Sequence, residues 1–91
     1  MIRVLNNTTT ETEYFIHTGG NMQVAAYGNF SGAKLMIKIS QDNSPYITLD
    51  DFKINKNDVL NIKMKNNTKY ILFLDSISVT SQVEVSIIWV I

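Results

Sequence analysis

One stretch of eight residues decides the fold class: Ala33-Lys34-Leu35-Met36-Ile37-Lys38-Ile39-Ser40. Leu35, Ile37 and Ile39 fall on one face of this stretch, which is entirely apolar. Lys34, Met36 and Lys38 fall on the opposite face, which carries two charges. Successive side chains of a β-strand point to opposite faces, so this alternation is typical of a strand with one face in the core. The sequence therefore predicts a half-buried strand over residues 33–40.

The segments on either side repeat this pattern between turn signals. Further strands are predicted over residues 13–18, 22–30, 46–49, 60–64, 69–74 and 82–91. Turn-forming residues separate them, as at 31–32 (Ser-Gly) and at 41–45 (Gln-Asp-Asn-Ser-Pro), where proline fixes φ and short polar side chains bond their own backbone. Phe52 and Ile54 either continue the strand over 46–49 or begin another one.

Composition and strand spacing together predict an all-β fold. The chain has 12 Ile, 7 Val and 8 Thr but only 3 Ala, and β-branched side chains fit a pleated sheet better than a helix. Seven or eight short strands, with turn signals about 8–12 residues apart, are typical of a sandwich. We predict one antiparallel β-sandwich domain over residues 1–91, of jelly-roll or immunoglobulin-like (Ig-like) type. Residues 1–11, where Ile2, Val4 and Leu5 precede a polar run, form either a short edge strand or an N-terminal arm.

The composition also excludes several classes of function. The 91 residues contain no cysteine, one histidine, and eight basic against eight acidic residues. Disulfides, thiolate metal sites and a cysteine nucleophile are excluded, and a lone His17 cannot supply the histidine sets of most catalytic zinc sites. Zero net charge argues against nucleic acid as a partner. The apolar run over 87–91 is far too short to span a bilayer, so no membrane partner is predicted.

The candidate catalytic residues have simpler interpretations. The acidic residues at 42, 50, 51 and 58 lack the ligand spacing and turn glycine of a calcium loop, and they are interpreted as solvent-exposed turn residues. His17 lies in an apolar-rich strand, and no G-x-S-x-G motif accompanies it, so it is interpreted as a structural or interface residue. We predict no enzyme, no catalytic residue, no metal site and no cofactor.

Two surface hypotheses remain weaker alternatives. Five lysines and one tyrosine could form a basic sheet face: Lys34, Lys38, Lys63, Lys65 and Lys69 with Tyr70. Because the net charge is zero, we interpret these lysines as solvent-facing residues that discourage edge pairing. Five aromatic residues could line a sugar-binding groove: Tyr14, Tyr27, Tyr46, Tyr70 and Trp89. Core packing is the default for strand aromatics, but a carbohydrate- or receptor-binding module stays the alternative function.

The hydrophobic content is high for the size of the chain. A protein of this mass buries only about 64% of its surface on folding, yet 45% of the residues are hydrophobic. Residues 69–74 and 83–91 are apolar on both faces, which predicts a surface buried against other copies or a shell. The predicted contact residues are Ile2, Val4, Leu5, Ile88 and Val90.

Residues 20–49 also carry a recognisable pattern. A strand is followed by Gly-x-Phe-x-Gly-Ala and by an alternating strand that ends in Ser-x-Asp, before an aromatic residue and a short strand. The matching residues are Gly28, Phe30, Gly32, Ala33, Ser40 and Asp42. This pattern resembles that of small virion proteins of tailed bacteriophages, and Lys69-Tyr70 and Thr80-Ser81 extend the resemblance over residues 19–90. Two departures are residues 43–45 (Asn-Ser-Pro) in place of a Gly-rich turn and Tyr46 in place of tryptophan.

The resemblance implies a function that composition does not. Such proteins are β-sandwich components of the virion, attached to the capsid or to head fibres and often trimeric. We therefore expect a non-enzymatic auxiliary or decoration protein located in the virion. Its expected partners are the major capsid protein or another virion protein, together with copies of itself, a trimer being favoured.

Overall fold

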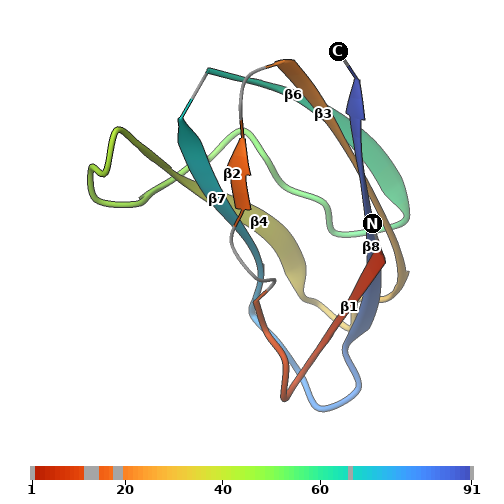
Figure 1. Ribbon diagram of the computed structural model, residues 1–91. Coiled ribbons are helices and arrows are strands. Elements are labelled where there is room, and N and C mark those ends of the chain that lie inside the picture. Colours follow the sequence, from red (N-terminus) through yellow and green to blue (C-terminus); the bar gives the residue numbers. More distant parts are fainter. Residues whose placement is uncertain (1, 12–14, 18–19, 66, 91) are drawn as a thin grey trace.

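The protein is a two-layer β-sandwich, seen in a computed structural model that describes residues 2–11, 15–17, 20–65 and 67–90 (Figure 1). At residues 2, 15–17, 89 and 90 only the backbone is described. The strands are β1 (Ile2–Asn6), β2 (Phe15–His17), β3 (Gly20–Asn29), β4 (Lys34–Gln41), β5 (Ile47–Thr48), β6 (Asp58–Met64), β7 (Thr68–Asp75) and β8 (Gln82–Val90). Sheet A has the order β1-β8-β3-β6 and sheet B the order β2-β7-β4-β5. The predicted all-β antiparallel sandwich is confirmed.

The strand pairing identifies the sandwich as a jelly roll. β1 pairs with β8, β2 with β7, β3 with β6 and β4 with β5, all antiparallel. These nested pairs make the chain one long hairpin that is folded into two sheets. The β3–β8 and β4–β7 pairs complete the two sheets by joining strands from different parts of that hairpin. Of the two predicted topologies, the jelly roll is correct and the Ig-like one is wrong.

Alternate residues of both sheets face inward and form one core. On β3, Met22, Val24 and Ala26 are buried as their spacing predicts. The fully buried side chains of the other strands and loops include Leu5, Leu35, Ile37, Ile54, Tyr70, Leu72, Val83 and Val85. On β4 the predicted inner face is confirmed, and Met36 on the opposite face is buried as well, where it pairs in register with Phe73. β7, which is apolar on both faces, lies between β2 and β4 as a central strand.

The segment after β5 differs from the strand that its sequence suggests. Phe52 and Ile54 are buried, but the structure gives this segment only an isolated bridge between Ile54 and Leu35. Two backbone hydrogen bonds form it, from the Leu35 N–H to the Ile54 carbonyl (2.7 Å) and from the Ile54 N–H to the Leu35 carbonyl (3.1 Å). The apolar side chains therefore anchor a loop at the edge of sheet B. Alternation alone cannot separate that from a strand.

The N-terminal segment is an edge strand whose alternation corrects one predicted contact residue. β1 pairs along β8, with Leu5 opposite Val83 and Val4 opposite Glu84. Leu5 shares the inward face of Val83 and is 1% exposed, whereas Val4 is 45% exposed. The prediction that Leu5 lies at a contact surface is therefore wrong, because neighbouring residues of a strand face opposite sides of the sheet.

The residues of the Gly-x-Phe-x-Gly-Ala pattern shape the end of β3 and the turn between β3 and β4. A Cβ on Gly28 would lie 2.5 Å from the backbone carbonyl oxygen of Gln82, so only glycine lets β3 approach β8 this closely. Phe30 and Ala33 are buried, and the Ala33 N–H donates to the Phe30 carbonyl (2.8 Å). Gly32 takes the positive φ of 86° that the turn requires. These residues specify the fold.

Gly28→Ala is expected to destabilise the protein far more than Gly32→Ala. At Gly28 the new methyl group meets a backbone oxygen, at a cost of about 3 kcal/mol, whereas at Gly32 no heavy atom lies within 4 Å. Strain at positive φ alone costs about 1 kcal/mol. Urea denaturation of the two variants checks this difference, and equal losses would contradict the steric explanation.

Tyr70 predicts how stability depends on alkaline pH. Burial raises the pKa of Tyr70 to about 12, from an ordinary value near 10. The folded state therefore favours the neutral phenol, and its contribution is complete below pH 10 and is lost as the pH rises toward 12. The unfolding free energy should fall by about 1.4 kcal/mol per pH unit in this window.

The Tyr70→Phe variant isolates this effect, because it keeps the ring and removes the ionisable group. We expect its urea midpoint to decline less between pH 9 and 11.5 than that of the parent protein. Tyr27 ionises in both proteins and cancels in the comparison. Identical declines would show that Tyr70 is not responsible.

Candidate interaction surfaces

The outer face of sheet A is a wide surface with no second layer over it in the described chain. The strand registers place four rows of residues on it: Val4-Glu84-Tyr27, Ile2-Ser86-Ala25-Val59, Ile88-Gln23-Asn61 and Val90-Asn21-Lys63. Val59 and Ile88 are 46% and 51% exposed, and Tyr27 is 40% exposed. Small side chains, Ala25 and Ser86, lie between them. Exposed apolar side chains are therefore spread over the strands of this face, with the carboxylate of Glu84 and the amide of Gln23 among them on the two central strands.

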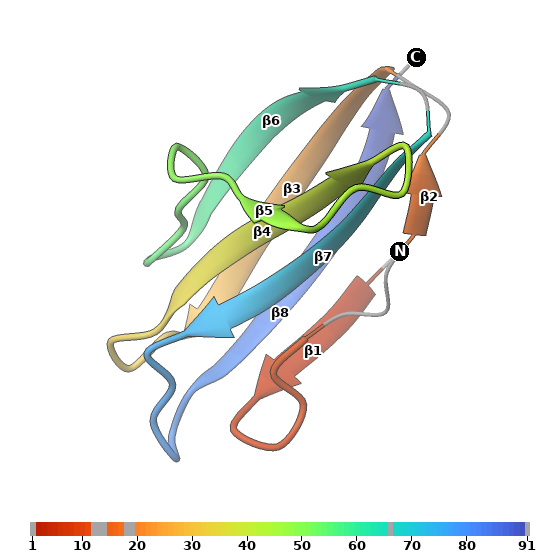
Figure 2. The same ribbon diagram turned by 90° about the vertical axis from the view of Figure 1, so that its left-hand side faces the viewer.

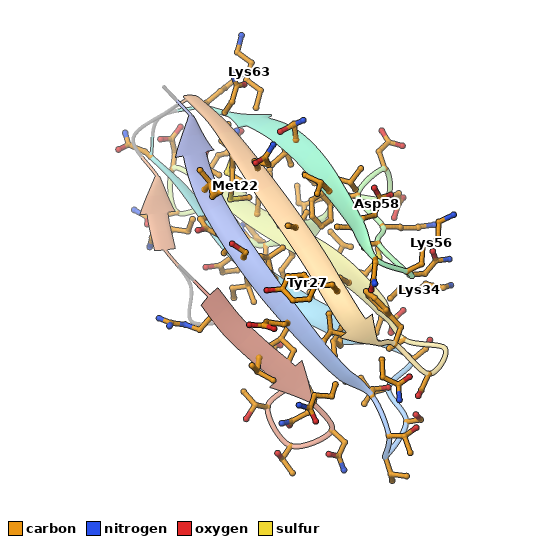
Figure 3. The ribbon with its side chains drawn as sticks, turned by 90° about the vertical axis from the view of Figure 1, so that its right-hand side faces the viewer. Met22, Tyr27, Lys34, Lys56, Asp58 and Lys63 are labelled. Atoms are coloured by element: carbon orange, nitrogen blue, oxygen red, sulfur yellow. The ribbon has the colours of Figure 1, made fainter. Side chains whose placement is uncertain are left out.

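Charged residues lie both on this face and at its border. Figure 3 shows Tyr27 on β3 in the middle of the face, with Lys63 at one end and Lys34, Lys56 and Asp58 along another border. Glu84 lies beside Tyr27 on the central strand β8. Such a mixture of apolar and polar groups is typical of contacts between proteins that also exist apart.

Glu84 is the acidic residue next to Tyr27 on this face. Desolvation raises the pKa of Tyr27 above its ordinary value, and the negative charge of the nearby Glu84 carboxylate raises it further. Tyr27 remains neutral and contributes a hydrophobic ring at physiological pH.

Sequence reasoning found part of this face. Val4 and Ile88 are exposed there as predicted. Ile2 and Val90 occupy register positions in its rows, but their side chains lie outside the described residues. Tyr27 and Val59 were not among the predicted contact residues. The alternation along β3 and β6 nevertheless places both of them on the face of the sheet that points away from the core.

A second surface lies on the other sheet, where β4 ends and β7 begins; we call it the Tyr46 hollow. It consists of two adjoining depressions of about 390 and 330 Å³ that share Asn43 and Lys69. Their other lining residues are Ser40, Asp42, Ser44, Tyr46, Asn67 and Ile71. Figure 2 shows the loop after β4 lying beside the start of β7. The hollow combines one aromatic ring with several short polar side chains.

The turn after β4 holds the polar side chains of the hollow in place. Asp42 and Asn43 have φ of 51° and 62°, and the Ser44 N–H donates to the Gln41 carbonyl (2.9 Å), as in a type I′ turn. The buried Ser40 hydroxyl donates to the Ser44 carbonyl and ties the turn to β4. Ser40 and Asp42, two residues of the Ser-x-Asp pattern, thus form this turn.

The lysines do not form one basic face. Lys34, Lys38 and Lys69 lie on the outer side of sheet B, whereas Lys63 lies on the outer face of sheet A. The Lys38 ammonium is 3.4 Å from the Glu11 carboxylate and 5.5 Å from the ring centroid of Phe73. Tyr70, the aromatic residue expected to accompany them, is buried in the core.

The acidic residues are similarly dispersed. Asp50 and Asp51 line a groove of about 320 Å³ beside β6, together with Leu60 and Ile62. Asp42 lines the Tyr46 hollow and not this groove. Among the described residues, no three His, Asp or Glu side chains are grouped so that they could hold a metal ion. His17 is described only in its backbone and Tyr14 lies outside the described residues.

The comparisons with known proteins do not indicate a function. No protein family, no curated protein and no solved structure matches this chain. In the part of the chain that the structure describes, no helix could span a bilayer. The outer face of sheet A and the Tyr46 hollow are the features of the described residues that bear on function.

Proposed function

We propose that this chain is a non-enzymatic structural protein of a bacteriophage virion, an auxiliary or decoration component of the capsid. It associates with copies of itself through the outer face of sheet A and attaches to the shell. The observation that carries this proposal is the set of exposed apolar side chains that this one face carries, namely Val4, Tyr27, Val59 and Ile88. A surface of this kind is unfavourable in water and is stabilised when another protein covers it.

The size of the face suits a protein contact. Strands about 4.8 Å apart and a rise of about 3.3 Å per residue give this four-stranded sheet an outer face of about 500 Å². Each partner in a standard interface contributes about 800 Å². The sheet face alone therefore supplies more than half of that area, and the side chains at its rim can supply the rest.

The resemblance of residues 28–42 to phage virion proteins supports the location of this contact in a virion. Jelly-roll sandwiches are also a common architecture of capsid proteins. The proposed partners are the major capsid protein or another virion protein, together with identical copies. A trimer is the favoured assembly because proteins of the resembling class are often trimeric.

Replacing Ile88 by glutamate is expected to weaken self-association. The parent protein should elute as an oligomer at micromolar concentrations, and Ile88→Glu should raise the dissociation constant at least tenfold because a charge is buried at the contact. Sedimentation equilibrium measures both constants.

Ile47→Glu is the matched control, because Ile47 is an exposed isoleucine on sheet B, 64% accessible. This variant should assemble like the parent protein. A parent protein that stays monomeric up to millimolar concentration would contradict self-association, and equal effects of the two variants would contradict the assigned face.

The virion location is tested separately from the oligomer. Mass spectrometry of purified particles of the encoding phage should detect the protein, and capsids lacking it should bind the added protein in a sedimentation assay. The capsid binding of the Ile88→Glu variant and of the Ile47→Glu control can be compared in the same sedimentation assay. Absence from particles together with no capsid binding would contradict a virion role.

A further inference from the structure

The Tyr46 hollow has the chemical make-up of a small-ligand site. Its two depressions, about 390 and 330 Å³, each reach the range of about 300–1,000 Å³ that ligand pockets occupy. Ligand pockets typically combine an apolar wall with a few polar groups that fix orientation. Here Tyr46 and Ile71 form the apolar wall, and the polar groups come from the turn after β4 and from the start of β7.

We propose that the Tyr46 hollow binds a pyranose sugar. A pyranose has one face of C–H groups and a rim of vicinal hydroxyl groups, each of which both donates and accepts hydrogen bonds. The Tyr46 ring, 39% exposed, offers a flat apolar surface to the C–H face. The Asn43 amide and the Ser44 hydroxyl line the same depression as the ring and can donate to and accept from the sugar hydroxyl groups, and Asp42 and Asn67 add polar groups in the adjoining depression.

The polar groups are held in position before any ligand arrives. The Lys69 ammonium donates to the Asn43 side-chain oxygen (3.0 Å), which links the turn after β4 to the first strand residues of β7. The Gln41 N–H donates to the Ser44 hydroxyl (3.2 Å), inside the same turn. The Lys38 ammonium lies over one face of the Tyr46 ring, 6.0 Å from its centroid, so a sugar would stack on the other face. Because these groups are already ordered, binding costs less conformational entropy.

Other ligand classes fit the hollow less well. A metal ion needs several oxygen ligands, and Asp42 is the carboxylate of the hollow, with the Lys69 ammonium opposing a cation. A single-stranded nucleic acid needs successive aromatic rings along a basic groove, and this hollow has one ring in a protein of zero net charge. A neutral, hydroxyl-rich ligand satisfies both the carboxylate and the ammonium.

The position of the hollow makes it independent of the proposed assembly face. The outer faces of the two sheets of a sandwich point in opposite directions, and the hollow is lined by residues of β4 and β7, two strands of sheet B. A protein that is attached to other copies through sheet A therefore still presents the Tyr46 hollow to solvent. Several copies in one assembly would bind a multivalent glycan much more tightly than one copy binds a single sugar.

The test is a titration of the ¹⁵N-labelled chain, followed by NMR, with glucose, galactose, N-acetylglucosamine and rhamnose up to 100 mM, preceded by a glycan array. We expect saturable shifts of the amides at 42–46 and 67–69 with at least one sugar. Tyr46→Ala should weaken that binding at least tenfold. Tyr27→Ala is the matched control, because Tyr27 is equally exposed (40% against 39%) but lies on sheet A, and it should bind like the parent protein.

A second variant keeps the test decisive if Tyr46→Ala does not fold. Asn67 has φ of 61°, which glycine adopts without strain, so Asn67→Gly removes the amide and preserves the turn; it should also weaken binding. A blank array with no saturable shift, shifts that map elsewhere, or loss of binding in Tyr27→Ala alone would overturn the proposal. Ile88→Glu should bind the sugar normally, which separates this result from the assembly test.

Discussion

Each strand of a two-layer sandwich turns one face toward the core and the other away from it, and this constraint organises the whole molecule. Inward residues such as Val24 and Leu72 have their role fixed by the core, where burial of apolar surface stabilises the fold. Outward residues are free of that requirement, so an apolar residue among them needs another explanation. Val59 and Ile88 are such residues, and they lie on the same sheet. The candidate interaction surfaces of this protein are therefore identified by the exposed residues that do not contribute to the core.

The same constraint explains how much of the fold the sequence predicts. Strict alternation, as at Met22–Ala26, identifies both the strand and its buried face. Where alternation breaks, prediction fails by one position: Val4 and Leu5 are adjacent and both apolar, and only the β1–β8 register decides which of them is buried. Phe52 is a different failure, because a loop packed on a sheet edge buries side chains as a strand does. The choice between jelly roll and Ig-like fold depends on long-range pairing, which local patterns do not contain.

The Tyr46 hollow illustrates why a site is harder to predict than a fold. Tyr46 was considered as a sugar-binding residue because of its ring, but its neighbours Asn67 and Lys69 are more than twenty residues away in sequence. The β4–β7 register, which places Ser40 opposite Lys69, brings the two turns together. By contrast, the recognisable pattern around Gly28 and Gly32 consists of residues with steric roles. The conspicuous motif specifies how the chain folds, while the proposed sites consist of ordinary residues.

The nested pairing of the jelly roll also orders the way the chain can fold. The innermost hairpin joins Ile39 to Ile47, whereas the outermost pair joins Ile2 to Ser86, and the entropic cost of closing a loop grows with its length. We therefore expect β1 to dock late, after β8 has joined β3. Because β1 supplies Val4, the outer face of sheet A is complete only when the last strand is in place. Assembly through that face would then select completely folded molecules, because a chain whose β1 has not docked lacks part of the contact surface.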